Sequence, residues 1–453
     1  MDFTSFIPAF GGVSFTVLAF IVSLSIIVFV HEFGHYIVGR WSGIHAEVFS
    51  VGLGPVLVSL TDRRGTRWQL ALIPFGGYVK FLGDKDAASS ADASALGTLR
   101  SDDLRRTMHG APLWARAATV AAGPVFNFIL AAAIFALIAL WQGQARDPLT
   151  IGELYPLPFE HGLENGDILL EINDIAVPSI DDGSAFSTFW QGLGNDDTYS
   201  YTVKRGDRII ETVGPNLSLA RVSQVVPRSA SAQARLSEGD VIIAVNETPV
   251  IRFSDLKTAV DGSNGATLDL TVWRGGEIIS VSLIPKRVDE PMKDGGFRTV
   301  WRIGLVGGEF FFEPQLTTID FFPALRFGVL QTWQIMRGSV EGLYHVIVGS
   351  ISTCNLSGPI GIAETSGDMA RQGGQSFIWF IALMSAAIGM VNLFPIPILD
   401  GGHLVFYAYE AVVGRPPAAE FLNILMMAGL TIVLSFMAFA IINDYLCLSL
   451  IHI

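Results

Sequence analysis

Four stretches of the sequence lack charged residues for long enough to cross a lipid bilayer, and they constrain the fold more than any other feature. They are Phe3–Val30, Ala117–Ala145, Gly373–Leu399 and Phe421–Asn443. A transmembrane helix needs about 20 apolar residues, so each stretch qualifies. The first has no basic residue before it and no small-residue cleavage site at its end, so we expect a retained anchor rather than a signal peptide. The charged content of 16%, against roughly 25% in ordinary globular chains, agrees with a membrane protein.

The distribution of Lys and Arg predicts how these spans are oriented. The segment between the first two spans is rich in basic residues, whereas the N-terminal tail has none. Basic residues near span ends favour the cytoplasmic side, so the N-terminus should lie outside and residues 41–113 inside. Four spans then return the C-terminus to the outside, and residues 146–371 become extracytoplasmic.

Two further features exclude classes of partner and site. The formal net charge is −13, which gives no support for binding nucleic acid. The two cysteines, Cys354 and Cys447, lack Cys-x-x-Cys spacing, so a thiolate zinc site is not expected.

Residues 56–82 predict a β-hairpin with an additional strand. Val56–Thr61 and Thr66–Ile73 are apolar or β-branched, and Asp62 to Gly65 between them supply a turn. Pro74 and the Gly76-Gly77 pair then bend the chain before a third strand over Tyr78–Leu82. Residues 84–103, rich in Ala, Ser and Asp, predict a linker.

The 146–371 segment contains an internal repeat. Gly166-Asp167 followed by an apolar run and Asn173 matches Gly239-Asp240 followed by an apolar run and Asn246. This pattern resembles the PDZ domain in the strand order used by bacterial proteases. A PDZ domain binds extended peptide by strand addition. The alternative is two small β domains that only screen the membrane part sterically.

Residues 320–350 are apolar with interspersed Arg326, Arg337 and Glu341. This pattern predicts an amphipathic helix on the membrane surface. The alternative is a linker helix packed on the second PDZ-like domain.

His31-Glu32-Phe33-Gly34-His35 follows the first apolar run directly. Residues four apart share one face of a helix, so the two imidazoles can bind one zinc ion while Glu32 activates water. Ionisable groups at membrane depth are costly and usually functional. The alternative is that the two histidines lie at the membrane interface and form hydrogen bonds with lipid headgroups. That alternative does not explain why they cluster with Glu32.

A catalytic zinc takes a third protein ligand, for which Asp400 is the leading candidate. It ends the third uncharged stretch, where Pro395 and Pro397 break the helix and Gly401-Gly402 permit close approach. Broken backbone inside a membrane is tolerated where it is buried in protein or lines a cavity. His403 is the competing candidate for the third ligand. Alternatively, its imidazole contacts a ligand residue without binding the metal, or it packs in the protein core.

Several motifs together resemble the site-2 proteases, a family of membrane-embedded zinc proteases. The two PDZ-like repeats between the second and third spans are similar to one branch of that family, and the resemblance covers nearly the whole chain. The matching segments are His31–His35, Gly123-Pro124-Val125-Phe126-Asn127, Asn392 to Gly402, Phe49–Pro55, Pro74–Lys80 and Leu356–Ile360.

The resemblance implies a role for each candidate residue. His31, His35 and Asp400 would bind zinc and Glu32 would be the general base. The sheet element over 56–80 would receive the unwound substrate at its edge. The implied substrate-binding residues are Asn392, Gly76, Gly77, Tyr78 and Asn127.

The resemblance also implies partners and a location. The substrates would be single-span membrane proteins, namely a trimmed anti-sigma factor in a stress response and remnant signal peptides. The PDZ-like domains would bind substrate ectodomains or exposed C-termini. The protein would lie in the inner membrane of a Gram-negative bacterium, with its N-terminus and PDZ-like domains in the periplasm.

The expected architecture is a four-transmembrane-helix metalloprotease core with a membrane-associated β-sheet element and two extracytoplasmic PDZ-like β domains. The expected segments are the first helix (1–40), the β element and linker (41–113), the second helix (114–145), the PDZ-like domains (146–214 and 215–288), a linker with the amphipathic helix (289–371), and the third and fourth spans (372–412 and 420–446).

Two other functions remain to be weighed against proteolysis. A membrane scaffold could bind protein termini without catalysis, but it would not need Glu32 and Asp400. A metal transporter could use intramembrane His and Asp, but it would not need a base-like Glu and two peptide-binding modules.

Overall fold

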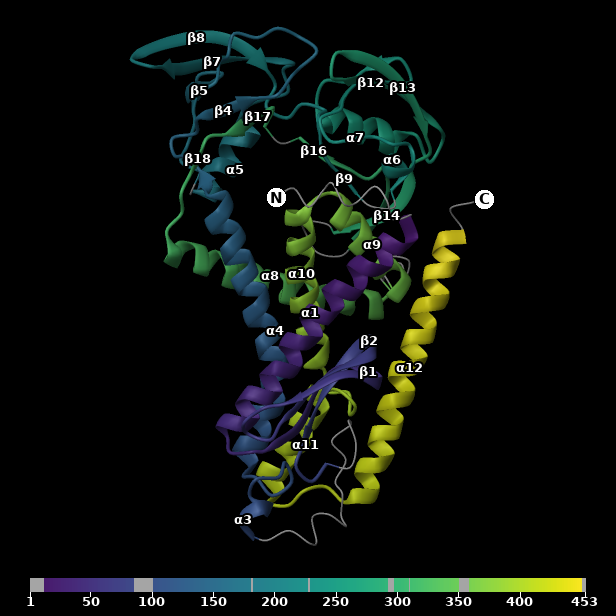
Figure 1. The fold of residues 1–453 in the computed structure, drawn as a ribbon. Coiled ribbons are helices and arrows are strands. Elements are labelled where there is room, and N and C mark those ends of the chain that lie inside the picture. Colours follow the sequence, from purple (N-terminus) through teal and green to yellow (C-terminus); the bar gives the residue numbers. More distant parts are fainter. Residues whose placement is uncertain are drawn as a thin grey trace. The chain divides into compact units, whose positions relative to one another are not determined.

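A computed structural model describes residues 12–84, 101–180, 182–226, 229–291, 297–308, 310–349 and 358–449. The chain divides into two compact units, Met1–Ala139 with Phe321–Ile453, and Leu140–Asp320. Figure 1 shows the elements of both units, coloured along the sequence. Most of the expected 84–103 linker lies outside the described residues.

Four of the described helices of the first unit are long and apolar enough to cross a membrane, in agreement with the four predicted spans. They are α1 (Gly12–Trp41), α4 (Leu113–Gln142), α10 (Gly374–Asn392) and α12 (Ala419–Ser449). The remaining described helices of this unit are α3 (Ser101–Leu104), α8 (Phe321–Ile347), α9 (Pro359–Arg371) and α11 (Asp400–Val413). Because α1 continues to Trp41, the motif at His31 lies inside the helix and not at its end.

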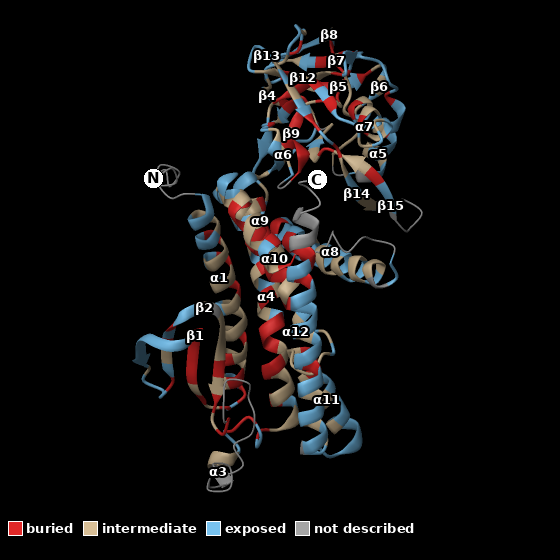
Figure 2. Ribbon diagram, turned by 90° about the vertical axis from the view of Figure 1, so that its right-hand side faces the viewer, coloured by how far each residue is buried: buried red, intermediate tan, exposed pale blue. Residues whose placement is uncertain are grey.

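Small residues set the spacing of the central helices. A Cβ on Gly34 of α1 would lie 2.5 Å from the carbonyl oxygen of Ala122 in α4, and a Cβ on Gly389 of α10 would lie 3.0 Å from Cβ of Asn127. Helices in membranes approach closely through such residues because apolar burial does not drive their association. In Figure 2, α4 and α10 carry buried faces, whereas most of the α12 surface is exposed. The exposed apolar residues of α12 suit contact with lipid.

The β element of the first unit consists of β1 (Ala46–Thr61) and β2 (Arg67–Phe81), joined by the predicted turn. Asp62 holds this turn, since its Oδ1 accepts hydrogen bonds from the amides of Arg64 and Thr66. Both strands bend, so that residues 48–51 lie beside both 77–80 and 67–70, and residues 56–61 pair with 67–71. The predicted hairpin is therefore confirmed, but the predicted second and third strands form one continuous bent strand, β2. The 46–51 portion, which pattern alone did not predict, lies in the middle of the sheet.

The second unit contains two four-stranded sheets with equivalent strand orders, β6-β5-β7-β8 and β11-β10-β12-β13. The first comprises β5 (Ile168–Ile172), β6 (Ile175–Ala176), β7 (Thr198–Arg205) and β8 (Arg208–Pro215), with α5 (Gly183–Gly192). The second comprises β10 (Val241–Val245), β11 (Thr248–Pro249), β12 (Leu268–Arg274) and β13 (Glu277–Leu283), with α6 (Ala230–Gln233) and α7 (Phe253–Gly262). We refer to these as the first and second modules. Each has its own apolar core.

The repeated sequence motif occupies equivalent positions in the two modules. Buried Asp167 accepts hydrogen bonds of 2.8 Å from Arg205, and buried Asp240 accepts bonds of 2.7 Å from Arg274. Asn173 and Asn246 both have positive φ, 50° and 47°, as turn residues with short polar side chains tolerate. The sequence repeat thus extends to matching tertiary contacts.

Residues 289–317 differ from the expected linker, because they contribute strands to both modules. The hairpin β14 (Lys286–Pro291) and β15 (Phe297–Arg302) leads to β16 (Leu305–Gly307), which pairs with β9 (Val222–Val225) of the second module. Next, β17 (Phe312–Pro314) pairs with β4 (Ile151–Leu154), and β18 (Leu316–Thr317) pairs with β3 (Gln144–Ala145). The second module is therefore inserted in the chain of the first. The predicted helix over 320–350 is confirmed as α8.

Candidate metal centre

Three ligand atoms converge between α1 and α11. Nε2 of His31 lies 3.2 Å from Nε2 of His35 and 3.2 Å from Oδ2 of Asp400. Nε2 of His35 lies 3.6 Å from the same carboxylate oxygen. Two atoms bound tetrahedrally to one zinc ion at about 2 Å lie about 3.3 Å apart. The spacing of this group therefore matches what a zinc ion requires.

The hydrogen bonds around the group leave its three facing atoms without protons. Nδ1 of His35 lies 2.8 Å from the carbonyl oxygen of Thr119. A carbonyl only accepts, so Nδ1 carries the proton and Nε2 presents its lone pair. Oδ2 of Asp400 is buried and receives no hydrogen bond from a described residue. Three lone-pair atoms so close together repel one another unless a cation lies between them, and two nitrogens with one oxygen suit zinc.

Asn127 of α4 is fully buried behind His31. Its Nδ2 lies 3.3 Å from Nδ1 of His31, while its Oδ1 has no partner among the described residues. Turning this amide by half a turn places Oδ1 against Nδ1, where it accepts the imidazole proton. Nε2 of His31 is then directed, unprotonated, toward Asp400.

The backbone of α4 forms one wall of the centre at Gly123. A Cβ at this position would lie 2.3 Å from Nε2 of His35 and 2.8 Å from Cε1 of His31. No side chain fits here without displacing both imidazoles.

The break between α10 and α11 places Asp400, as Pro395 and Pro397 predicted. Residues 393–399 form no helix, and Asp400 begins α11. A Cβ on Gly401 would lie 2.2 Å from the carbonyl oxygen of Leu393, and one on Gly402 would lie 2.3 Å from that of Ile396. The two glycines therefore permit the predicted close approach.

An ion pair holds α11 to α4. Nη2 and Nη1 of Arg116 lie 2.6 and 3.0 Å from the two carboxylate oxygens of Glu410. Both side chains are mostly buried, and the guanidinium also lies over the ring of Tyr407. This bidentate pair fixes the helix that carries Asp400.

Glu32 faces the edge of the β element. The backbone amide of Val79 lies near its carboxylate. A Cβ on Gly77 would lie 3.2 Å from Cγ of Glu32. In the described strands, residues 77–81 pair on one side only, with residues 46–51. Glu32 and an unpaired strand edge are therefore adjacent.

The remaining sequence candidates lie at different places around the centre. Asn392 is the half-buried last residue of α10, and no described residue forms a hydrogen bond with its side chain. The hydroxyl of Tyr78 accepts a hydrogen bond from Gln69. His403 lies against the ring of Phe406 and outside the three-residue group. Asn127 contacts a metal-ligand candidate instead of an open surface.

Sequence reasoning missed the carbonyl of Thr119, the amide of Val79, the wall at Gly123 and the pair of Arg116 with Glu410. The first two are backbone groups that any residue type supplies. Gly123 belonged to one of the motifs that resemble the family, but the sequence alone did not indicate what the glycine does. Arg116 was visible as a charge at the start of a span.

The fold and the site are those of a membrane protein with a candidate zinc centre. Comparison with known proteins identifies the family of proteases to which the chain belongs. The model of Peptidase family M50 matches residues 19–436. Proteins from Agrobacterium fabrum and Rhizobium meliloti with the provisional name zinc metalloprotease are each 34% identical, over 96% of this chain and 97% of theirs. Metalloprotease MmpA of Caulobacter vibrioides is 31% identical over 93% of both chains.

The chain belongs to Peptidase family M50, the site-2 proteases. It is a zinc metalloprotease with four helices that fit a multi-pass membrane protein.

Proposed function

We propose that this protein hydrolyses peptide bonds within transmembrane segments of single-span membrane proteins. One observation carries the proposal. The three ligand atoms, at the spacing that zinc requires, and Glu32 lie on apolar helices, beside an unpaired edge of the β element. The resemblance to site-2 proteases suggests a trimmed anti-sigma factor and remnant signal peptides as substrates.

His31, His35 and Asp400 hold the zinc ion in this proposal. When bound, zinc lowers the pKa of water and polarises a peptide carbonyl. Glu32 accepts the proton of the attacking water and delivers it to the nitrogen of the departing amine. Asn127 and the carbonyl of Thr119 orient the two imidazoles.

The substrate must unwind before cleavage, because helical backbone groups are already paired. In an extended strand, backbone groups two residues apart point the same way. The amide of Val79 lies near Glu32, and Gly77 lies against the same side chain, so we assign the amide and carbonyl of Gly77 to the side that faces Glu32. We assign the edge at Gly76, Gly77 and Tyr78 as the strand that pairs with the unwound substrate, with Asn392 contacting its backbone near the scissile bond.

The basic residues between the first two spans support a cytoplasmic location for the β element, in a bacterial inner membrane. His31 lies in the second half of α1, and Asp400 follows α10; both helices would begin outside, so the centre would lie toward their cytoplasmic ends. The scissile bond should then lie in the cytoplasmic half of the substrate's span. Mass spectrometry of the two products of a reconstituted reaction locates that bond. A cut in the outer half would contradict the proposed orientation.

The two modules are PDZ-like domains in this proposal, and they filter substrates by size or by an exposed terminus. Because β3 and β18 pair at the base of the first module, residues 146–315 can be replaced by an Asn-Gly turn. The shortened enzyme should cleave untrimmed substrates. If it cleaves trimmed substrate and leaves untrimmed substrate intact, the modules are not a filter.

A further inference from the structure

One face of α1 packs on the β element, and the proposed base lies on that face. Val28, Glu32 and Tyr36 follow one another at four-residue intervals, so they share one side of the helix. A Cβ on Gly77 of β2 would lie 3.1 Å from Cγ1 of Val28 and 3.2 Å from Cγ of Glu32. The ring of Tyr36 packs against Phe49 of β1. Any movement of the sheet along α1 therefore moves the strand edge at Gly77 past Glu32.

The polar contacts between α1 and the β element converge on one carboxylate, that of Asp62 in the turn between β1 and β2. Its Oδ2 accepts hydrogen bonds of 3.3 Å from both the hydroxyl of Tyr36 and the indole nitrogen of Trp68. Nη1 of Arg40 lies 3.5 Å from the same oxygen and donates a hydrogen bond to the hydroxyl of Tyr36. Among the described residues, no other side chain of the β element forms a hydrogen bond with a side chain of α1. We refer to these four residues as the clamp.

The two carboxylate oxygens of Asp62 have separate partners. Oδ1 accepts hydrogen bonds from the amides of Arg64 and Thr66 and so closes the turn. All contacts of the clamp end on Oδ2 instead. A change at Oδ2 alone can therefore release α1 while the turn of the hairpin stays closed.

Aromatic packing connects the clamp to the middle of the sheet. Ring centroids of Tyr36 and Trp68 are 5.0 Å apart, and those of Trp68 and Phe49 are 4.4 Å apart. Phe49 is also the register partner of Val79, whose amide lies near Glu32. One row of residues across the sheet thus runs from the clamp to the strand edge beside the base.

The clamp fixes a position that packing alone leaves free. Apolar contacts have little directional preference, so they hold the sheet on the helix without setting its place along the helix axis. Hydrogen bonds weaken steeply when distance or angle changes. Tyr36 lies one helical turn, about 6 Å, from Glu32. Because a displacement of about 1 Å can cost about a hundredfold in rate, the clamp controls a distance on which catalysis depends.

We propose that Asp62, Tyr36 and Arg40 are positioning residues that align the edge of β2 with Glu32, and that this alignment determines which peptide bond is cut. The inference rests on the proposed function, because it deepens the assignment of residues 76–78 as the strand that pairs with the substrate.

Asp62→Asn tests the clamp in the purified full-length enzyme with a trimmed single-span substrate. Asparagine keeps an oxygen for the turn amides, but its NH₂ group donates where Oδ2 accepted, so it cannot receive the hydrogen bonds of Tyr36 and Trp68. We expect kcat to fall at least about tenfold, with KM changed by less than about threefold. Mass spectrometry of the products should show cuts at neighbouring bonds beside the parental one. Bound zinc should stay stoichiometric.

Tyr36→Phe is the milder variant, because it keeps the ring packing and removes only the hydroxyl. It should shift the cut bond and lower kcat in the same way, to a smaller degree. Where Asp62→Asn is too slow for its products to be mapped, Tyr36→Phe decides.

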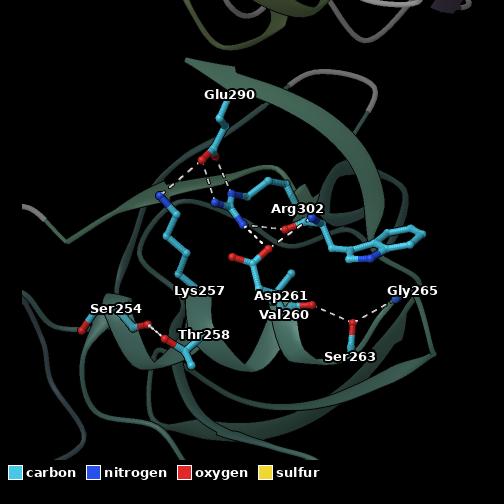
Figure 3. A network of polar contacts seen from close by, with 10 residues as sticks. Ser254, Lys257, Thr258, Val260, Asp261, Ser263, Gly265, Glu290 and Arg302 are labelled. Atoms are coloured by element: carbon cyan, nitrogen blue, oxygen red, sulfur yellow. Dashed lines mark hydrogen bonds and ion pairs between the residues drawn. The ribbon is translucent and has the colours of Figure 1, made fainter. Parts of the chain in front are cut away.

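Asp261→Asn is the matched control, because Asp261 also accepts hydrogen bonds from a backbone amide and an arginine. Its Oδ1 accepts a bond of 3.2 Å from the amide of Trp301 and one of 2.8 Å from Nη1 of Arg302, which also pairs with Glu290 (Figure 3). All these residues belong to the second module. The control should cut the parental bond with unchanged kcat.

Three results would overturn the inference. The first is that Asp62→Asn and Tyr36→Phe cut only the parental bond with unchanged kcat. The second is that they lose folded protein or zinc while the remaining enzyme still cuts only the parental bond, which indicates a structural role alone. The third is that Asp261→Asn shifts the cut bond equally. If the parent enzyme cuts no single-span substrate, the proposed function itself fails, and this inference fails with it.

Discussion

Gly123 offers a sharp test of the metal centre, because a single methyl group there collides with both histidines. In Gly123→Ala, the new Cβ would lie 2.3 Å from Nε2 of His35, whereas ordinary contacts begin at 3.4 Å. The imidazole must retreat by about 1 Å, yet functional metal sites hold their ligand distances within about 0.2 Å. Cε1 of His31, at 2.8 Å, must shift as well. Loss of even an orienting contact around a metal costs about 10–100-fold in affinity, so displacing two ligands should cost at least about 100-fold.

The assay is equilibrium dialysis of the purified protein against a zinc buffer, with bound zinc quantified by mass spectrometry. Gly338→Ala is the matched control. Gly338 lies in α8, and no described atom beyond the backbone of its own helix lies within 4 Å of the position that the new methyl group would take. The control should bind zinc as the parent does. If Gly123→Ala binds zinc with unchanged affinity and remains folded, the claim that α1, α4 and α11 surround one zinc ion is wrong.

Three further predictions concern the same centre. Asp400→Ala should abolish stoichiometric zinc binding, while His403→Ala should retain it; the reverse result in the dialysis assay would make His403 the third ligand. Asn127→Ala should lower zinc affinity by about 10–100-fold through loss of imidazole orientation, and an effect on substrate KM alone would instead indicate direct substrate contact. Arg116→Glu and Glu410→Arg should each lower turnover, and the double variant should recover it with a coupling energy of about 1–3 kcal/mol; additive losses would show that the pair does not position α11.

The parts of the structure that sequence predicted are those set by local pattern. Long uncharged runs identify spanning helices because lipid excludes charge, and the spacing of His31 and His35 places both on one helical face. Asp400 was predictable because prolines and glycines mark a broken helix at membrane depth. These features depend on neighbours within a few residues.

The parts that sequence did not predict depend on contacts between distant segments. β16 and β17 span only three residues each, too few for an alternating pattern, so residues 289–317 were expected to be a linker. Their strand assignment comes from partners at 222–225 and 151–154. Likewise, Arg116 and Glu410 are 294 residues apart in the chain. Neither the residue types nor their spacing in the sequence shows that these two residues form an ion pair.

The central claim is that Glu32 and a zinc ion held by this chain cleave a membrane span. The most direct measurement is cleavage of a single-span substrate by the purified, reconstituted enzyme, compared with Glu32→Gln and with the parent after chelation and zinc restoration. Glu32→Gln should retain stoichiometric zinc and lose activity by at least about 100-fold, and chelation should abolish activity that added zinc restores. Substantial cleavage by Glu32→Gln, or cleavage that persists in protein shown to be free of zinc, would contradict the account.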